Sequence, residues 1–256
     1  MNTDKTPYKL LQYLADGRFH SGESMGTDLG MTRSAIWKAI QQLNKLSLDI
    51  ESVTGKGYRL NGGIDLLNAD AIKSQLSDTT RQTLSHLDLI QSVDSTNTEL
   101  LTHANDSQKT NRACFAEQQT AGRGRRGRNW SSPFGTNIYF SLLWHFAKDP
   151  AEIAGLSLAS AIAVTRTLKR YGIDTEFGLK WPNDILWQGR KLSGILIDMV
   201  AQSHDQCSVV IGIGINTNMS DNQSESIDQE WASLSEIIQQ PIDRNRLAGL
   251  LLDETT

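Results

Sequence analysis

Apolar residues recur every three or four positions through the first 45 residues, and this spacing predicts three short helices. The first begins at Thr6-Pro7 and ends at Asp16-Gly17, because threonine and proline favour a helix start and glycine favours its end. The second runs over Ser21–Leu29 and stops at Gly30, and Thr32 caps the third. Three helices with so tight a turn between the last two are typical of a helix-turn-helix motif.

The third helix presents a polar face that is a candidate for contact with DNA. Its helical spacing places Ile36, Ile40 and Leu43 on the packed side. A hairpin is predicted over residues 50–60 with Lys56 at its tip, and such a hairpin is typical of the wing that follows a helix-turn-helix. A small helical packing or dimerisation domain fits the same spacing equally well. The candidate contacts to phosphates and base edges are Thr32, Arg33, Ser34, Trp37, Lys38, Gln41 and Lys56.

The run Asn61-Gly62-Gly63 is the best candidate for a domain boundary, since consecutive glycines interrupt regular structure. We therefore assign residues 1–62 to a winged helix-turn-helix domain and residues 63–256 to a second domain. A long Ala-rich helix is predicted over Glu152–Tyr171, and a polar loop over Thr217–Gln229. Strands and hairpins are predicted over residues 87–93, 113–118, 137–144, 180–187, 191–197 and 208–216.

Composition adds a few exclusions. The chain has 256 residues, 38% of them hydrophobic, and a net charge of −4. Residues 1–60 hold eight Lys and Arg against six Asp and Glu, whereas the remainder holds 17 against 23. A slightly basic N-terminal module on an acidic body is compatible with DNA binding. No apolar run is long enough to span a membrane and no signal peptide is visible, so we expect no membrane partner. Two cysteines and scattered histidines predict a reduced, cytoplasmic location and no structural metal.

An unusual loop follows the predicted strand over residues 113–118. Four arginines and three glycines fall between Gly122 and Arg128, a density that excludes a core segment. A solvated basic turn and an anion clamp both fit, and the loop alone does not choose between them. The glycines also satisfy G-x-G-x-x-G, but no helix start and no suitably spaced acid follows, which disfavours a dinucleotide site. Because its charges repel one another, we expect the loop to be mobile until an anion orders it.

Three further stretches have a functional and a plain interpretation. The hydroxyls and amide of Ser95–Asn97 suit a polar ligand, but taken alone an ordinary helix N-cap is favoured. Lys180 precedes a Trp-Pro corner that can hold it inward, although the ordinary fate of a lysine is solvent. Because Gly212 and Gly214 lack side chains, another group can lie flat against the strand at these positions.

Taken together, the motifs resemble one known family. DSTN, GRGRRG-x-x-W, KWPND, RKLSGIL and GIGIN follow a winged helix and closely resemble the bacterial bifunctional biotin–protein ligases and biotin operon repressors. The similarity extends from about Lys9 to Ala248. It implies a mixed-sheet α/β fold similar to that of class II aminoacyl-tRNA synthetases, so that residues 63–256 become a biotin- and ATP-binding catalytic domain.

The resemblance implies a two-step reaction. Biotin attacks the α-phosphate of ATP to give biotinyl-5′-adenylate and pyrophosphate, with Mg²⁺ as cofactor. A lysine of biotin carboxyl carrier protein then attacks the adenylate, which leaves an amide and AMP. The adenylate is also the corepressor: it favours a homodimer that binds operator DNA. No nucleophilic Ser, Cys or His is needed, since positioning and electrostatics do the work.

The resemblance also carries residue roles onto this sequence. The catalytic residues it implies are Lys180 and Arg125. The biotin-binding residues are Ser95, Thr96, Asn97, Gln119, Arg123, Gly124, Arg125 and Lys180. The residues for ATP and adenylate are Arg125, Arg128, Asn183, Asn216 and Trp231.

One departure from the family affects the functional hypothesis. Family members usually continue into a small SH3-like β-barrel, whereas this sequence ends at Thr256 within a predicted helix, so we expect that domain to be absent. The alternative function is therefore a ligand-responsive DNA-binding repressor with weak or no ligase activity. A third hypothesis replaces biotin by lipoate or another acyl acid.

Overall fold

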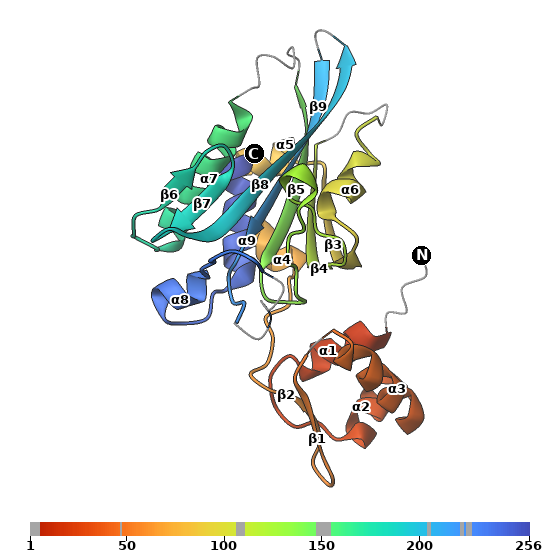
Figure 1. The fold of residues 1–256 in the computed structure, drawn as a ribbon. Coiled ribbons are helices and arrows are strands. Elements are labelled where there is room, and N and C mark those ends of the chain that lie inside the picture. Colours follow the sequence, from red (N-terminus) through yellow and green to blue (C-terminus); the bar gives the residue numbers. More distant parts are fainter. Residues whose placement is uncertain are drawn as a thin grey trace. The chain divides into compact units, whose positions relative to one another are not determined.

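The computed structural model describes residues 6–46, 48–105, 111–146, 155–203, 206–220, 223 and 227–256. The chain divides into two compact units, Met1–Leu66 and Leu67–Thr256 (Figure 1). Each unit has its own elements and its own buried residues, and each is described by itself below.

The N-terminal unit is a three-helix motif followed by a hairpin, as the sequence predicts. Its elements are α1 (Thr6–Leu14), α2 (Gly22–Leu29), α3 (Arg33–Asn44), β1 (Ile50–Val53) and β2 (Gly57–Leu60). Ser21 caps α2, Gly30 ends it in the left-handed conformation with φ 65°, and the Thr32 hydroxyl accepts a hydrogen bond from Ala35 N at the start of α3. Ile36, Ile40 and Leu43 of α3 are buried against α1 and α2, which confirms the predicted packed face.

The second unit is built on one large sheet. Its elements are α4 (Ala69–Ser74), α5 (Asp78–Thr83), β3 (His86–Val93), α6 (Thr96–Leu101), β4 (Arg112–Gln119), β5 (Ile138–Phe146), α7 (Leu156–Tyr171), β6 (Gly178–Lys180), β7 (Asp184–Trp187), β8 (Arg190–Ser203), β9 (Gln206–Ile215), α8 (Leu234–Ile238) and α9 (Arg244–Thr255).

The sheet is mixed, which confirms the predicted α/β class. Its strand order is β3-β4-β5-β9-β8-β7-β6, with β3 parallel to β4 and every other neighbouring pair antiparallel. Helices α4, α7 and α9 cover one face, where residues such as Phe115 and Phe140 meet Val164 and Leu251. Helix α6 covers part of the other face through Leu100. Strands β4, β5 and β9 are thus buried on both faces, which is why they read as nearly continuous apolar runs.

A buried ion pair connects α9 to β4, the strand that leads into the loop over Gly122–Arg128, which is called the arginine loop below. Arg244 is fully buried, and its Nη2 donates to Glu117 Oε2 of β4 at 2.8 Å and to Asn137 O at 3.0 Å. The other carboxylate oxygen accepts from Leu67 N at 2.6 Å. A buried ion pair is tolerated when its remaining donors and acceptors are also bonded, as they are here. The pair therefore fixes the position of β4 relative to α9.

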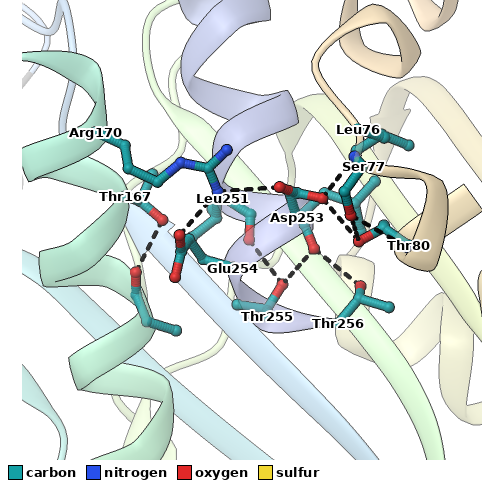
Figure 2. Close-up of polar contacts among 12 residues, drawn as sticks. Leu76, Ser77, Thr80, Thr167, Arg170, Leu251, Asp253, Glu254, Thr255 and Thr256 are labelled. Atoms are coloured by element: carbon teal, nitrogen blue, oxygen red, sulfur yellow. Dashed lines mark hydrogen bonds and ion pairs between the residues drawn. The ribbon is translucent and has the colours of Figure 1, made fainter.

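The C-terminal end of α9 is held by a polar cluster around Asp253 (Figure 2). Its Oδ1 accepts from Ser77 N and from the Thr80 hydroxyl, each at 2.8 Å, and its Oδ2 accepts from Arg170 Nη1 at 3.0 Å. Burial by itself would raise the pKa of Asp253, but these hydrogen bonds outweigh it and lower that pKa to about 2. The cluster ties α9 to α5 and α7.

Some predictions differ from the structure or lie outside it. Helix α7 begins at Leu156 and ends before Gly172; residues 152–154 of the predicted helix lie outside the described residues. The same holds for residues 221–222 and 224–226 of the predicted loop over 217–229. Among the described residues, no helix is both long enough and apolar enough to cross a membrane.

Candidate functional site

Two adjoining cavities open on the second unit beside the arginine loop. The larger has a volume of about 1000 Å³ and lies between this loop, the 180–184 corner and the segment around Trp231. The smaller, of about 50 Å³, lies between α6, β4, β8 and β9. The residues that line both cavities are Gly124, Arg125, Trp130, Asn183 and Lys191. The region common to both cavities is therefore walled by two cations, an amide and an indole.

The arginine loop is a closed turn in this structure. Gly124 N donates to Arg128 O at 2.7 Å, and Trp130 N donates to Gly122 O at 2.9 Å. Between them lies only a 3₁₀ turn, Arg125–Gly127, in which Arg126 has the left-handed φ of 57°. Because no α-helix follows β4, the loop lacks the helix N-terminus that a dinucleotide fingerprint requires.

Two of the loop arginines bind other elements. Arg123 donates from both terminal nitrogens to the carboxylate of Asp198 on β8, at 3.0 and 3.2 Å. Arg125 Nη1 donates to Asn183 Oδ1 at 3.1 Å. These bonds distinguish the loop from a freely solvated turn. Arg128 is exposed and lines the larger cavity with Arg126.

The N-terminal turn of α6 is buried and faces the smaller cavity. Ser95, Thr96 and Asn97 are only 2–3% exposed. Ser95 makes no side-chain capping bond, so the ordinary N-cap favoured from the residues alone is wrong at this position. Instead, Thr96 donates from both its backbone N and its hydroxyl to Gln119 Oε1, at 2.9 and 3.1 Å. Two predicted biotin contacts, Thr96 and Gln119, are thus brought together from separate elements.

The bare strand at Gly212 and Gly214 is covered by the protein's own side chains. A methyl group added at Gly214 would lie 2.5 Å from Cε2 of Trp130, and one at Gly212 would lie 2.1 Å from Asn97 Oδ1. On the neighbouring strand, a methyl group at Gly194 would lie 3.0 Å from the same indole. The space that these glycines were expected to leave is filled by Trp130 at Gly214 and by Asn97 at Gly212.

The two lysines of the site differ in their surroundings. Lys180 is exposed beside the larger cavity because it is the last residue of the edge strand β6, so of the two placements that the sequence left open the structure shows the solvent-exposed one. Lys191 lines both cavities, with its Nζ 3.0 Å from Asp184 Oδ1 and 5.4 Å from the centre of the Trp130 ring. Both side chains of the Lys191–Asp184 pair are 15% exposed. Sequence reasoning missed Lys191, although it lies inside the RKLSGIL motif.

The remaining predicted nucleotide contacts line the larger cavity in different ways. Asn183 accepts from Arg125 and donates to Ile195 O at 3.0 Å. Asn216 is buried, and its Nδ2 donates to the carbonyls of Lys191 and Ala232. Trp231 forms an isolated backbone β-bridge with Lys191, and it is half-buried. Asn216 therefore contributes to the cavity wall, but its side-chain N–H groups already donate to carbonyl groups of the protein.

The electrostatics of the larger cavity favour an anion. Among the described residues, its lining holds five cations, which are Arg125, Arg126, Arg128, Lys180 and Lys191, against Asp184 and Asp228. A cavity with such an excess of positive side chains suits phosphate or carboxylate groups. No three His, Cys, Asp or Glu side chains gather as a metal site in the part of the chain that the structure describes.

On the N-terminal unit, the predicted DNA contacts lie on one helix and on the hairpin tip. Thr32, Arg33 and Ser34 are exposed at the start of α3, and Trp37 is 54% exposed one turn later. Lys38, Gln41 and Lys56 are also exposed. The Lys56 ammonium lies 5.7 Å from the centre of the Phe19 ring.

Two family models match the chain. Residues 89–216 match the biotin/lipoate A/B protein ligase family, and residues 8–59 match a helix-turn-helix domain. The first range contains the cavity-lining residues of α6, of the arginine loop and of β8 and β9. The second range contains most of α1 and the elements that follow it, up to β2.

Individual relatives are similar over most of the chain. The bifunctional ligase/repressor BirA of Escherichia coli is 42% identical over 99% of this chain and 76% of its own length. BirA of Bacillus subtilis is 36% identical over 90% of this chain and 70% of its own. A solved structure of biotin protein ligase from Aquifex aeolicus in complex with biotin and ATP has a TM-score of 0.54 and 34% identity, covering 67% of this chain and 69% of that chain.

Proposed function

Because the chain belongs to the biotin/lipoate A/B protein ligase family, with a helix-turn-helix domain in front, we propose that it is a biotin–protein ligase and a biotin-responsive repressor. Biotin is activated by ATP to biotinyl-5′-adenylate, and the biotinyl group then passes to a lysine of biotin carboxyl carrier protein. The observation that carries the proposal is the pair of adjoining cavities with Arg125 and Lys191 in their common wall.

The first step requires two anions to approach each other. The biotin carboxylate oxygen forms a bond to the α-phosphorus while the bond to pyrophosphate breaks. We assign the acid to the smaller cavity, where Ser95, Thr96, Asn97 and Gln119 offer hydrogen bonds, and the nucleotide to the larger one. Carboxylate and α-phosphate then meet beside Arg125 and Lys191, whose fixed charges offset the repulsion and stabilise the transition state.

The roles of the loop follow from its chemistry. Backbone N–H groups near Gly124 and the Arg123 and Arg125 guanidinium groups can close over both substrates, because glycine lets the main chain approach closely. Arg128, Asn183, Asn216 and Trp231 would line the nucleotide. Lys180, an exposed residue in the lining of the larger cavity, would meet the outer phosphates, and we propose Lys191 as the lysine at the reacting carboxylate.

Magnesium fits the larger cavity as a partner of the phosphates. Mg²⁺ usually keeps waters and binds one or two protein carboxylates together with substrate phosphates. Asp184, whose carboxylate lies in the lining, is the residue that would hold it. The ion would supply neutralisation of the phosphate charge during the first step.

In the second step, the amine of the carrier lysine attacks the acyl carbon of the adenylate. The C–N bond forms, the C–O bond to AMP breaks, and the amine loses a proton. In the wall of the smaller cavity, burial raises the pKa of Tyr139, so its hydroxyl stays neutral and donates to Pro133 O at 2.7 Å.

We propose further that adenylate occupancy governs repression. The exposed face of α3 and the tip at Lys56 would contact operator DNA, and ligand binding would favour a homodimer that spans two half-sites. The domain limits proposed for these roles are residues 1–62 for DNA and residues 63–256 for catalysis. The two buried free cysteines, Cys114 and Cys207, suit a reducing cytoplasm.

The test is ATP-dependent labelling of a biotin carboxyl carrier domain, followed by intact mass. We expect one added biotinyl group per carrier, and none when ATP is omitted. Lipoate in place of biotin is the matched control for the related acyl acid, and preferential transfer of lipoate would contradict the proposal. Biotin binding without any transfer would favour the alternative function, a ligand-responsive repressor with little or no ligase activity.

A further inference from the structure

Asp198 lies on β8 where its carboxylate meets two parts of the site at once. Its Oδ2 accepts from Arg123 Nη1 at 3.0 Å and its Oδ1 accepts from Arg123 Nη2 at 3.2 Å. Oδ2 also accepts from Asn97 Nδ2 at 3.0 Å. One carboxylate thus joins the beginning of the arginine loop to the N-terminal turn of α6.

The surroundings make this contact stronger than an ordinary surface ion pair. The Asp198 side chain is 21% exposed and that of Arg123 is 42% exposed. Exposed single pairs contribute little to stability. Here, however, the planar guanidinium makes two parallel bonds, a geometry that adds strength and fixes orientation. Within the part of the chain that the structure describes, both side-chain hydrogen bonds of Arg123 go to this carboxylate, so removing its charge releases the guanidinium.

Asp198 also orients the Asn97 amide, together with the Leu196 carbonyl, which accepts from Asn97 Nδ2 at 3.4 Å. With Nδ2 bonded to Asp198, Asn97 Oδ1 points to the Ser141 hydroxyl at 2.6 Å. That hydroxyl lies 2.7 Å from Thr96 Oγ1, and Thr96 in turn contacts Gln119. The chain of contacts therefore runs from Asp198 to the polar groups that we assign to the acid.

The loop needs a fixed point because the smaller cavity has to widen. Ligand pockets commonly measure ~300–1,000 Å³, whereas the smaller cavity measures about 50 Å³. The middle of the loop must therefore shift when a bicyclic acid enters. Beyond Arg123, the loop is bonded mainly to itself and, through Arg125, to Asn183. A bond at Arg123 keeps the loop attached to the sheet during that shift.

We propose that Asp198 is a positioning residue for the activation of the acid. It anchors Arg123 and orients Asn97, so that the loop stays over the site while the middle of the loop adjusts to the ligand. Asp198 acts through these two residues and does not itself take part in bond making. The inference rests on the proposed function for its kinetic consequence, but the anchoring of the loop is a property of the ligand-free chain.

Limited digestion with trypsin tests the anchor without any substrate. The cleavage sites are the four loop arginines Arg123, Arg125, Arg126 and Arg128, and intact mass reports which of them is cut. Asp198→Asn keeps the size of the side chain and removes its charge. We expect loop cleavage to be at least about threefold faster in this variant, because cleavage follows the population of the open loop.

Two further variants are the controls. Asp198→Glu keeps the charge and should restore cleavage to within about twofold of the wild-type rate. Glu51→Gln removes a carboxylate that pairs with Arg59 in the N-terminal unit, outside the site, and should leave loop cleavage unchanged. Unchanged loop cleavage in Asp198→Asn would overturn the proposal.

Steady-state kinetics of pyrophosphate release test the consequence for the acid. Asp198→Asn should raise KM for biotin about tenfold and leave kcat within about threefold, because the acid is positioned less well while the reacting groups remain. An unchanged KM would overturn the proposal. So would a lowered KM, which would mean that Asp198 competes with the acid for Arg123. If the wild-type chain releases no pyrophosphate, the proposed function fails, and the tryptic comparison still decides the anchor.

Discussion

At the scale of single residues, the site depends on glycines, because other residues occupy the space that a side chain at these positions would need. Gly194 and Gly214 are paired across β8 and β9, and the Trp130 indole lies against both. Gly212 leaves the space that Asn97 occupies. These glycines lie in regular strands, so a demand for unusual backbone angles does not explain them; space does. The indole they admit forms part of the wall between the two cavities.

Gly214→Ala tests this platform. The added methyl group would lie 2.5 Å from the Trp130 indole, so the ring must move off β9. Overpacking of this kind costs about 1–3 kcal/mol of stability. We also expect biotin to bind at least about tenfold more weakly, since each factor of ten needs only about 1.4 kcal/mol. Urea unfolding and calorimetric titration measure the two effects.

The matched control is Gly155→Ala at the start of α7, where an added methyl group meets no atom within 4 Å and φ is −81°. Its stability should change by less than about 0.5 kcal/mol. Biotin binding unchanged in Gly214→Ala would show that the indole's position on the glycines is irrelevant to the ligand.

At the scale of elements, α9 is positioned by polar contacts at both ends. Arg244 is paired with Glu117 near its beginning, and Asp253 is bonded to α5 and α7 near its end (Figure 2). Between these ends, apolar residues such as Leu247 and Leu251 pack under the sheet. Since Glu117 belongs to β4, the placement of α9 also supports the strand from which the arginine loop emerges.

The Asp253 cluster predicts how stability changes in acid. The pKa of Asp253 is lowered in the folded chain from an ordinary value of 3.8 to about 2. Its contribution is therefore fully present above about pH 4 and is lost as the pH falls from about 4 towards 2. The shift corresponds to about 2 kcal/mol, at 1.36 kcal/mol per pKa unit.

Urea unfolding at pH 5, 4 and 3 measures this contribution. Asp253→Asn should be less stable than wild type at pH 5, and the gap should narrow as the pH falls, because the variant has no carboxylate to protonate. Asp174→Asn, at an exposed position, serves as the control and should keep a constant gap. A gap for Asp253→Asn that is the same at every pH would rule out the lowered pKa.

At the scale of the whole molecule, the two proposed activities occupy different units. The candidate DNA contacts lie in Met1–Leu66, and the two cavities are lined by residues of Leu67–Thr256. Substitutions on the surface of α3 should therefore affect DNA binding without altering biotin transfer. Coupling between the activities would then require the ligand to change the population of a DNA-binding state.

Lys38→Ala tests this separation. With a nonspecific DNA duplex as the probe, the slope of log affinity against log salt should decrease by about 1, the effect of losing one phosphate contact. Biotin transfer to the carrier should stay within about twofold of wild type, a change of about 0.4 kcal/mol or less. Lys73→Ala on α4 removes an equal charge from the other unit and should leave the salt slope unchanged. An unaltered slope in Lys38→Ala would count against the α3 face.

The sequence by itself determined helices α1 to α3, most of α7, most of the strands and the residue types of the site, but no prediction covered α5 or α8. Periodicity and caps located α1 to α3, because these signals act between residues that are close along the chain, such as Thr32 and Ala35. For the same local reason, the density of arginine and glycine between Gly122 and Arg128 excluded a core segment and left a solvated basic turn and an anion clamp as the two interpretations. The family resemblance rested on motifs that are likewise contiguous.

Only the tertiary structure decided which of these residues share a wall. Lys180 and Lys191 look alike in the sequence, but Lys191 lies in β8, an inner strand, where it pairs with Leu186 of β7 and contacts Trp130 between the cavities, whereas the edge position of β6 leaves Lys180 exposed. Asp198 gave no sequence signal, since its partners Asn97 and Arg123 are 101 and 75 positions away. Contacts of this range depend on the order of strands in the sheet, which local spacing does not specify.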